Sequence, residues 1–200
     1  MTIDLAAMLD RIRRIAQESL ETKRLFFESH ANDVADAARL IADSIKAGGK
    51  LLVFGNGGSA ADAQHIAAEL VNRLAGDRPP IAALALTTDT SVLTSIANDS
   101  SFDEAFERQI RALGRPGDIA LAISTSGNSP NVIRGVWAAR ETGMKIVALS
   151  GRGGGNLVGI SDVALCVESN STQRIQETHI TIGHILCELV EEDLFGGGEP

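Results

Sequence analysis

The sequence predicts an α/β fold, a three-layer αβα sandwich in which helices cover both faces of a five-stranded parallel sheet. Five short apolar runs alternate with segments of helical spacing, which is the pattern of a parallel sheet. The runs are continuously apolar, as expected for strands that are buried on both faces. The length of 200 residues fits one domain. We therefore expect a single domain over 1–200, with an N-terminal helical element at 1–49 and an α/β core at 50–195.

Each expected strand is followed by small or polar residues, and most of these loops lead into a helical pattern. The five runs are LLVFG after Lys50, IAALALT at 81–87, DIALAIS at 118–124, MKIVALS at 144–150 and DVALCVE at 162–168. In sheets of this kind, ligands bind beyond the carboxyl ends of the strands, where the strand order reverses. The loops at these ends are therefore the first place to look for a functional site.

Two helical patterns precede the first strand, and four follow later in the chain. The first has apolar residues at Leu5, Met8, Leu9, Ile12, Ile15 and Ala16; the second has Val34, Ala38, Ile41 and Ile45 and stops at Gly48-Gly49. The later patterns cover Ser59–Leu74, Phe102–Leu113, Asn131–Thr142 and Thr172–Leu194. The first pattern precedes the sheet and carries an apolar stripe, which predicts a helix–helix contact in a homo-oligomer. The tail Gly196–Pro200 is expected to fray.

Composition excludes several classes of function. The formal charge is −8, from 18 basic and 26 acidic residues, which disfavours nucleic-acid and anionic-membrane binding. No run reaches the roughly 18 apolar residues that span a membrane, and the N-terminus does not have the pattern of a secretory signal. Cys166 and Cys187 lie in apolar surroundings and are expected to be reduced and buried. A cytoplasmic protein is the default expectation.

The loop after the first strand, Gly55-Asn56-Gly57-Gly58-Ser59-Ala60, is glycine-rich and enters a helix. Glycines there let backbone N–H groups approach an anion at the positive end of the helix. The loop also matches the spacing of a dinucleotide-binding fingerprint. That fingerprint expects an acidic residue about 20 positions further on, and Pro79-Pro80 occupies that place. A tight strand-to-helix turn is the alternative explanation.

The loop after the third strand predicts a phosphate site. Its sequence, Ser124-Thr125-Ser126-Gly127-Asn128-Ser129-Pro130, offers four hydroxyls at the start of a helix. It lacks the lysine of a Walker A nucleotide loop. The pattern suits a terminal phosphomonoester on a small molecule, whereas an ordinary polar turn would need only one of these hydroxyls.

Two helices carry residue types that bind metals. His65 and Glu69 are four residues apart on one helix, and Gln176 and His184 are eight apart on the last helix, so each pair shares a face. Imidazole and carboxylate groups form a common metal-binding set, and a glutamine oxygen is a less usual addition. Spacing alone favours the simpler interpretation of a surface ion pair and a solvated histidine.

Four segments together resemble the phosphoheptose isomerases, a family of single sugar-isomerase (SIS) domains. These segments are GNGGSAADAQHIAAEL at 55–70, ALTTDTSVLTSIAND at 85–99, STSGNSPNV at 124–132 and RIQETHITIGHILCELVE at 174–191. The resemblance implies a flavodoxin-like SIS fold assembled as a homotetramer. It also implies the interconversion of sedoheptulose 7-phosphate and D-glycero-D-manno-heptose 7-phosphate, the first step of nucleotide-activated heptose biosynthesis.

The resemblance also implies which residues form the site. One Zn²⁺ per subunit would be held by His65, Glu69, Gln176 and His184, which replaces the simpler interpretation above. Substrate contacts would fall on Asn56, Gly57, Gly58, Glu69, Asn98, Asp99, Ser124, Thr125, Ser126, Ser129 and Gln176. Some members have an acidic residue before RIQE, where this chain has Gln173, so we assign no catalytic role to that position.

Aldose–ketose isomerisation moves a proton between C1 and C2 through an enediol, which requires a base and stabilisation of the oxyanion. We expect Glu69 to act as the base and His184 to return or relay a proton, with zinc as the Lewis acid. Because both residues are also expected zinc ligands, it stays open whether each acts as a ligand, as an acid or base, or as both.

Two alternatives are weighed against this function. One is an isomerase of another sugar phosphate. The other is a non-enzymatic regulatory SIS tetramer that binds a replication initiator protein. A scaffold has no chemical reason to keep His65, Glu69, Gln176 and His184 together, which favours an enzyme.

Overall fold

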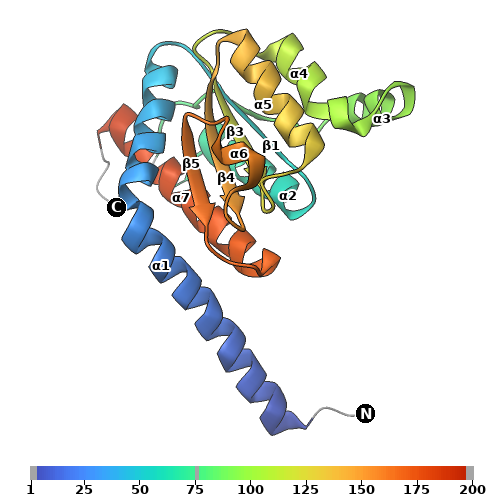
Figure 1. Cartoon of the computed structure of the whole chain (residues 1–200). Helices are drawn as coiled ribbons and strands as arrows, with labels where there is room; N and C mark the ends of the chain where they lie inside the picture. Colours follow the sequence, from blue (N-terminus) through green and yellow to red (C-terminus); the bar gives the residue numbers. More distant parts are fainter. Residues whose placement is uncertain (1–3, 75–76, 197–200) are drawn as a thin grey trace.

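The computed structural model describes residues 4–74 and 77–196 and confirms the expected fold class (Figure 1). Five parallel strands form one sheet in the order β2-β1-β3-β4-β5. Their bounds are β1 Leu51–Gly55, β2 Ala83–Ala85, β3 Ile119–Ser124, β4 Lys145–Gly151 and β5 Val163–Val167. This is the flavodoxin-like order, whose direction reverses between β1 and β3.

Helices cover both faces of the sheet. On one face lie α1 (Leu5–Lys46), α2 (Gly58–Val71) and α7 (Thr172–Phe195). The other face carries α4 (Ala105–Leu113), α5 (Pro130–Thr142) and the short α6 (Gly155–Val158). α3 (Thr90–Asp99) and the 3₁₀ turn η1 (Phe102–Glu104) precede α4, and α3 projects from the body of the molecule (Figure 1). Each face has its own apolar core, so the sheet is buried between two layers.

The strands follow the apolar runs closely, with one shortened. β1, β3 and the inner part of β4 are fully buried, as their continuous apolar character predicts. The second run, expected at 81–87, is a strand only over Ala83–Ala85. Its first residue, Ile81, lies outside the strand because its N–H donates to the Leu70 carbonyl at the end of α2, at 3.0 Å, instead of joining the sheet.

The two N-terminal helical patterns are parts of one helix, α1, which contains 42 residues. The segment between them, 17–33, has no glycine or proline to break the helix. Arg24 bridges Glu21 and Glu28 on its surface at 2.7 and 2.6 Å. At 1.5 Å per residue the helix is about 63 Å long, and its buried residues all lie from Phe26 onward.

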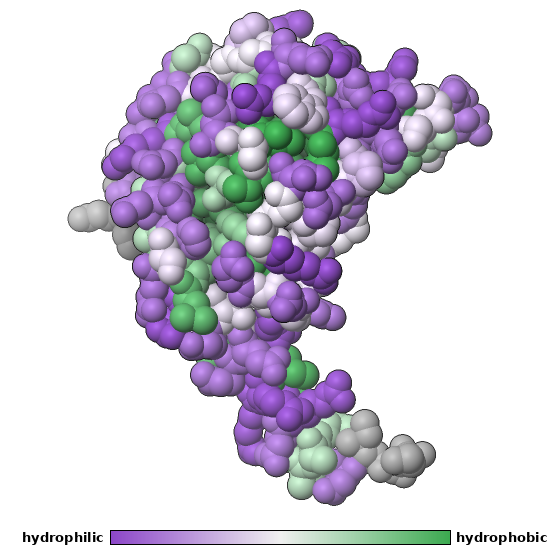
Figure 2. Space-filling view, viewed as in Figure 1, coloured by the Kyte–Doolittle hydropathy of each residue, from purple (hydrophilic) through white to green (hydrophobic). Residues whose placement is uncertain are grey.

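The N-terminal half of α1 leaves the body of the molecule and exposes apolar side chains (Figure 1). They are Leu5, Met8, Leu9, Ile12, Ile15, Leu20 and Leu25. Figure 2 shows hydrophobic residues along this half and over the face that carries β5 and α6. No helix among the described residues is long and apolar enough to cross a membrane. Residues 197–200 of the tail that was expected to fray lie outside the described residues.

The two cysteines are free thiols, as expected. Cys187 on α7 is buried, and this burial raises the pKa of its thiol to about 12. The expectation that both are buried is wrong for Cys166, which is only half-buried. Cys166 lies on β5, which has a neighbouring strand on one side only and is therefore less covered.

Candidate functional site

The two loops singled out in the sequence lie side by side at the carboxyl ends of β1 and β3, where the strand order reverses. Asn56 in the first loop and Asn131 at the start of α5 exchange two amide hydrogen bonds, of 2.8 and 2.9 Å. These bonds join the glycine-rich loop to the hydroxyl-rich loop. The predicted Asn56 is thus a link between both loops at the place where ligands bind in this fold.

The glycine-rich loop needs glycine at two successive positions. Gly57 has a φ of 58° and stands at the N-cap of α2, a conformation that suits a residue without a side chain. At Gly58, a Cβ atom would lie 2.5 Å from the Nε2 atom of Gln176. The first turn of α2 is therefore packed against the amide of Gln176 on α7, which brings three predicted site residues together.

Three hydroxyls of the second loop converge at the N-terminus of α5. Ser124 Oγ lies 2.9 Å from Ser129 Oγ and 3.4 Å from Ser126 Oγ. Ser129 occupies the N-cap position, but its hydroxyl makes no capping bond to the helix, and Pro130 follows at the helix start. In the first turn Pro130 has no N–H, and the Val132 N–H donates to Asn131 Oδ1 at 2.9 Å. The hydroxyls therefore lie next to the Asn131 N–H and the positive end of the helix, which is a good anion-binding geometry. Thr125 lies in the same turn and is half-buried.

The hydroxyl-rich loop is held in place by the loop that follows β4. Gly127 has a φ of 63°, and a Cβ atom there would collide with the Gly154 carbonyl group. Asn128 Oδ1 accepts a hydrogen bond of 3.0 Å from the backbone N–H of Asn156, and the Leu157 N–H donates to the Gly127 carbonyl at 3.1 Å. The shape of the candidate phosphate site therefore depends on close backbone packing between two loops.

The second cluster lies between α2 and α7. His65 Nε2 is 2.9 Å from His184 Nε2 and 3.4 Å from Glu69 Oε1. One ligand atom from each of these residues lies within 4.8 Å of the others, which suits a single metal ion. Two imidazole nitrogens and one carboxylate oxygen are a typical donor set for zinc. The helical spacing of His65 and Glu69 thus does produce a cluster once α7 packs alongside.

Asp62 adds a carboxylate that sequence reasoning missed. Its Oδ2 atom is buried and has no hydrogen-bond partner among the described residues. Burial raises the pKa of the Asp62 carboxyl, while the nearby His65 and His184 side chains act in the opposite direction. Asp62 precedes His65 by three residues on α2, so its helical spacing was a signal that could have found it.

Other predicted residues lie outside the histidine cluster. Gln176 packs against Gly58, and His184 lies eight residues, or about 12 Å, further along α7. Within this chain Gln176 is therefore closer to the loops than to the two imidazoles. Asn98 and Asp99 are exposed at the end of the projecting α3, where Asn98 Nδ2 donates to Asp99 Oδ1 at 2.7 Å. Their predicted roles remain predictions.

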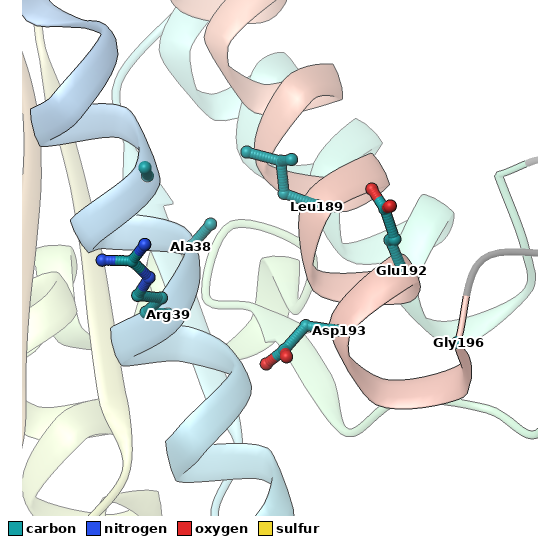
Figure 3. Close-up of a pocket in the computed structure, with 7 residues that line it drawn as sticks. Ala38, Arg39, Leu189, Glu192, Asp193 and Gly196 are labelled. Carbon is teal, nitrogen blue, oxygen red and sulfur yellow. The ribbon is translucent and has the colours of Figure 1, made fainter.

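A surface groove elsewhere contains none of these residues. It lies between the second half of α1 and the C-terminal end of α7 (Figure 3). Arg39 lines it on α1, with Glu192 and Asp193 on α7. The groove is thus separate from both the loops and the histidine cluster.

His179 on α7 stabilises the fold by packing against the sheet. The side chain is fully buried, and its Nε2 atom lies 2.9 Å from the Ser150 carbonyl oxygen of β4. Burial lowers the pKa of His179 to about 4, because a charged imidazolium would be desolvated. The neutral ring therefore fixes α7 to the sheet.

This lowered pKa predicts an acid-sensitive fold. The unfolded state, with an ordinary histidine pKa of about 6.5, binds a proton that the folded state excludes. The contribution of neutral His179 to the free energy of unfolding is fully present above about pH 6.5. As the pH falls towards 4, the free energy of unfolding decreases by up to about 3 kcal/mol. Urea unfolding at several pH values should show this loss, and His179→Gln should show a shallower pH dependence. An unchanged slope in that variant would refute the assignment.

The family of the chain follows from comparison with known proteins. Residues 16–151 match the family model of the SIS domain. The phosphoheptose isomerase of Aquifex aeolicus is 55% identical over 185 residues, which cover 92% of this chain and 97% of that protein. The phosphoheptose isomerase of Azoarcus sp. is 53% identical over 192 residues, covering 94% and 98%. The chain belongs to the phosphoheptose isomerase family.

Solved structures of phosphoheptose isomerases agree with this assignment. The enzyme of Neisseria gonorrhoeae has a TM-score of 0.88 at 44% identity, covering 92% of this chain and 99% of that one. The enzyme of Francisella tularensis has a TM-score of 0.90 at 36% identity, covering 96% and 100%. The resemblance noted in the sequence is confirmed, and with it the SIS fold.

Proposed function

We propose that the protein interconverts sedoheptulose 7-phosphate and D-glycero-D-manno-heptose 7-phosphate. The observation that carries this proposal is the convergence of His65, Glu69 and His184 between α2 and α7 in a chain of the phosphoheptose isomerase family. An aldose–ketose isomerase needs a base and an electrophile near the reacting carbons. The cluster offers both kinds of group, and a non-enzymatic SIS protein would have no chemical need for it.

The hydroxyl-rich loop would bind the phosphate of the substrate. Ser124, Ser126 and Ser129 present converging hydroxyls, and the N-terminus of α5 supplies the Asn131 N–H and a positive dipole. We assign the remaining contacts to Asn56, Gly57 and Gly58 of the adjoining loop and to Thr125 and Gln176. Binding energy at the phosphate, far from the reacting carbons, orients the sugar for the chemical step.

The donor set fits a zinc ion. His65 Nε2 and His184 Nε2 face one another at 2.9 Å, with the Glu69 carboxylate beside them. Zinc binds imidazole nitrogen and carboxylate oxygen at about 2.0–2.2 Å, so a small separation of the rings would admit it. We therefore propose His65, Glu69 and His184 as ligands. Gln176, predicted as a fourth, packs against Gly58 in this chain, and its role as a ligand stays a prediction. When bound, zinc would supply Lewis-acid polarisation of the substrate oxygens.

We assign the proton transfers to the same cluster. In the ketose-to-aldose direction, Glu69 removes a proton from C1 and, as a carboxylic acid, returns it to C2 of the enediol. The hydroxyl proton of O1 is lost as the C1 carbonyl forms, and O2 gains one. Because His184 Nε2 faces His65 at the proposed metal position, we assign the relay between the two oxygens to His184 Nδ1. Glu69 can be both a ligand and a base because its carboxylate has two oxygens. Oε1 faces His65, and we assign proton transfer to Oε2.

Removal of the metal should abolish activity. After treatment with a chelator, turnover should fall about a hundredfold or more and return on addition of Zn²⁺, because Lewis-acid stabilisation supplies several kcal/mol. Elemental analysis and turnover are measured on the same samples. Full activity in a sample without bound zinc would rule out the metal as a cofactor.

We also propose that the protein is a homotetramer held together by α1. Exposed apolar residues at Leu5, Met8, Ile12 and Ile15 follow a 3-4-3 spacing, which is the seam of a helix–helix contact. Light scattering should give about four times the chain mass of 21.0 kDa. Ile12→Glu should lower that mass, whereas Arg11→Glu on the same helix should not. A monomeric wild-type protein would contradict this assembly.

A further inference from the structure

Arg78, in the segment between α2 and β2, is an arginine whose side chain is almost entirely buried. Only 4% of the side chain is exposed. Burial of a guanidinium is costly unless its N–H groups are bonded and its charge is paired. The partners of Arg78 therefore show what the burial achieves.

One set of partners is the C-terminal end of α2. Arg78 donates from Nη2 to the Glu69 carbonyl and from Nη1 to the Leu70 carbonyl, both at 2.8 Å. These carbonyls belong to the last turn of the helix, where no further N–H of the helix is available to them. A cation at this end also interacts favourably with the helix dipole. Arg78 thus acts as the C-terminal cap of α2.

The other partners lie on α7. Arg78 Nε donates to Glu191 Oε2 at 2.6 Å, and the guanidinium carbon lies 5.9 Å from the centre of the Phe195 ring. Glu191 follows His184 by seven residues, or about two turns, so both lie on one face of α7. The same guanidinium therefore joins the helix of Glu69 to the helix of His184.

α2 and α7 run in the same direction along this contact. Gln176 packs against Gly58 near the start, and Gly183 approaches Ile66 further along, where a Cβ atom would lie 2.8 Å from the Ile66 side chain. The His65–His184 contact lies at that level, and the Arg78 contacts follow at the far end. The histidine cluster is thus flanked by helix packing on one side and by Arg78 on the other.

We infer that Arg78 is a positioning residue for the candidate metal site. Glu69 lies two residues before the last residue of α2, in a turn whose end carbonyls are bonded from outside the helix by Arg78 and, at Leu70, also by the Ile81 N–H. By bonding this turn and tying it to α7, Arg78 fixes the Glu69 carboxylate relative to the two imidazoles. The inference rests on the proposed function for the role of the cluster in metal binding and catalysis. The contacts that Arg78 makes with α2 and α7 involve no substrate and do not depend on that function.

The test is Arg78→Met, with three readouts. Purified protein is stripped of metal, and its Zn²⁺ dissociation constant is measured by competition with a chelator. kcat and KM for sedoheptulose 7-phosphate are then measured on the zinc-loaded protein. We expect a Zn²⁺ dissociation constant raised about tenfold and kcat lowered about tenfold, as for loss of other residues that orient metal ligands. KM should change less than twofold, because the hydroxyl-rich loop is not in contact with Arg78.

Arg140→Met is the matched control. Arg140 also donates to a backbone carbonyl, that of Ile160 at 2.9 Å, and lies 5.9 Å from the centre of the Trp137 ring, but it belongs to α5 in the opposite layer. Its substitution should leave all three readouts within twofold. Arg78→Lys, which keeps the charge, should recover part of the loss. If Arg78→Met does not fold, Arg78→Lys and Glu191→Gln provide the same measurements.

A folded Arg78→Met protein with wild-type zinc affinity and kcat would overturn the inference, as would equal losses in Arg140→Met. Failure of the proposed function would give a different result, namely wild-type protein without isomerase activity. The zinc-affinity measurement does not depend on catalysis, so it tests Arg78 in either case.

Discussion

Glu69→Gln should abolish isomerisation while leaving binding of a phosphate ligand intact. The substitution preserves size but removes the carboxylate that we assign as base, and general bases contribute about 10²–10⁴-fold to such reactions. Glu69 lies on α2, 3.4 Å from His65 and away from the serine hydroxyls of the α5 loop. Steady-state turnover and calorimetric titration with a non-reactive sugar phosphate measure the two effects separately.

Glu141→Gln is the control for this experiment. Glu141 is an exposed carboxylate on α5 that pairs with Arg111 at 2.7 Å, in the layer opposite the histidine cluster. Its substitution also removes one negative charge but should leave turnover unchanged. Wild-type turnover in Glu69→Gln would eliminate this residue as the base and leave His184 or Asp62 to be tested.

Gly127→Ala should disrupt the hydroxyl-rich loop. Alanine would have to adopt a φ of 63°, which costs about 1–2 kcal/mol, and its Cβ would collide with the Gly154 carbonyl group. Because one of the two loops must move, the serine hydroxyls separate. We expect KM for the sugar phosphate to rise at least about tenfold and the melting temperature to fall. Steady-state kinetics and thermal unfolding measure both.

Gly117→Ala separates backbone strain from loop displacement. Gly117 also has a positive φ, of 90°, but a Cβ atom there has no neighbour within 4 Å, and the residue precedes β3 at the opposite edge of the sheet. This variant should lose stability with an unchanged KM. An unchanged KM in Gly127→Ala as well would show that the loop does not bind the phosphate.

The sequence predicts most of the sheet because its strands are buried on both faces. β1 and β3 contain almost nothing but apolar residues, so their positions can be recognised without knowledge of the fold. The two loops were also recognisable locally, because each places glycines or several hydroxyl residues directly after an apolar strand, where ligands bind in this fold. α3 was not expected, because it buries no residue and depends on a cap from Asp89 to the Val92 N–H.

The cluster was only partly visible in the sequence. Spacing places His65 and Glu69 on one helix face, but whether His184 joins them depends on how α7 packs against α2. The same limit applies to Arg78, whose partners lie on α2 and α7, whereas the three-residue spacing of Asp62 and His65 on α2 was a local signal. Long-range packing decides the contacts of His184 and Arg78, and no local pattern encodes it. The continuity of α1 was missed because charged residues in the segment 17–33 interrupt the regular apolar spacing, although Leu20, Leu25, Phe26 and Phe27 lie within it.

Incubation of the purified protein with sedoheptulose 7-phosphate, with and without added Zn²⁺, tests the central claim most directly. Formation of the aldose heptose 7-phosphate is followed over time, with Glu69→Gln as the inactive comparison. We expect conversion to an equilibrium mixture by the zinc-loaded protein and little by the metal-free protein. No conversion under either condition would contradict the proposed function and favour a regulatory SIS protein instead.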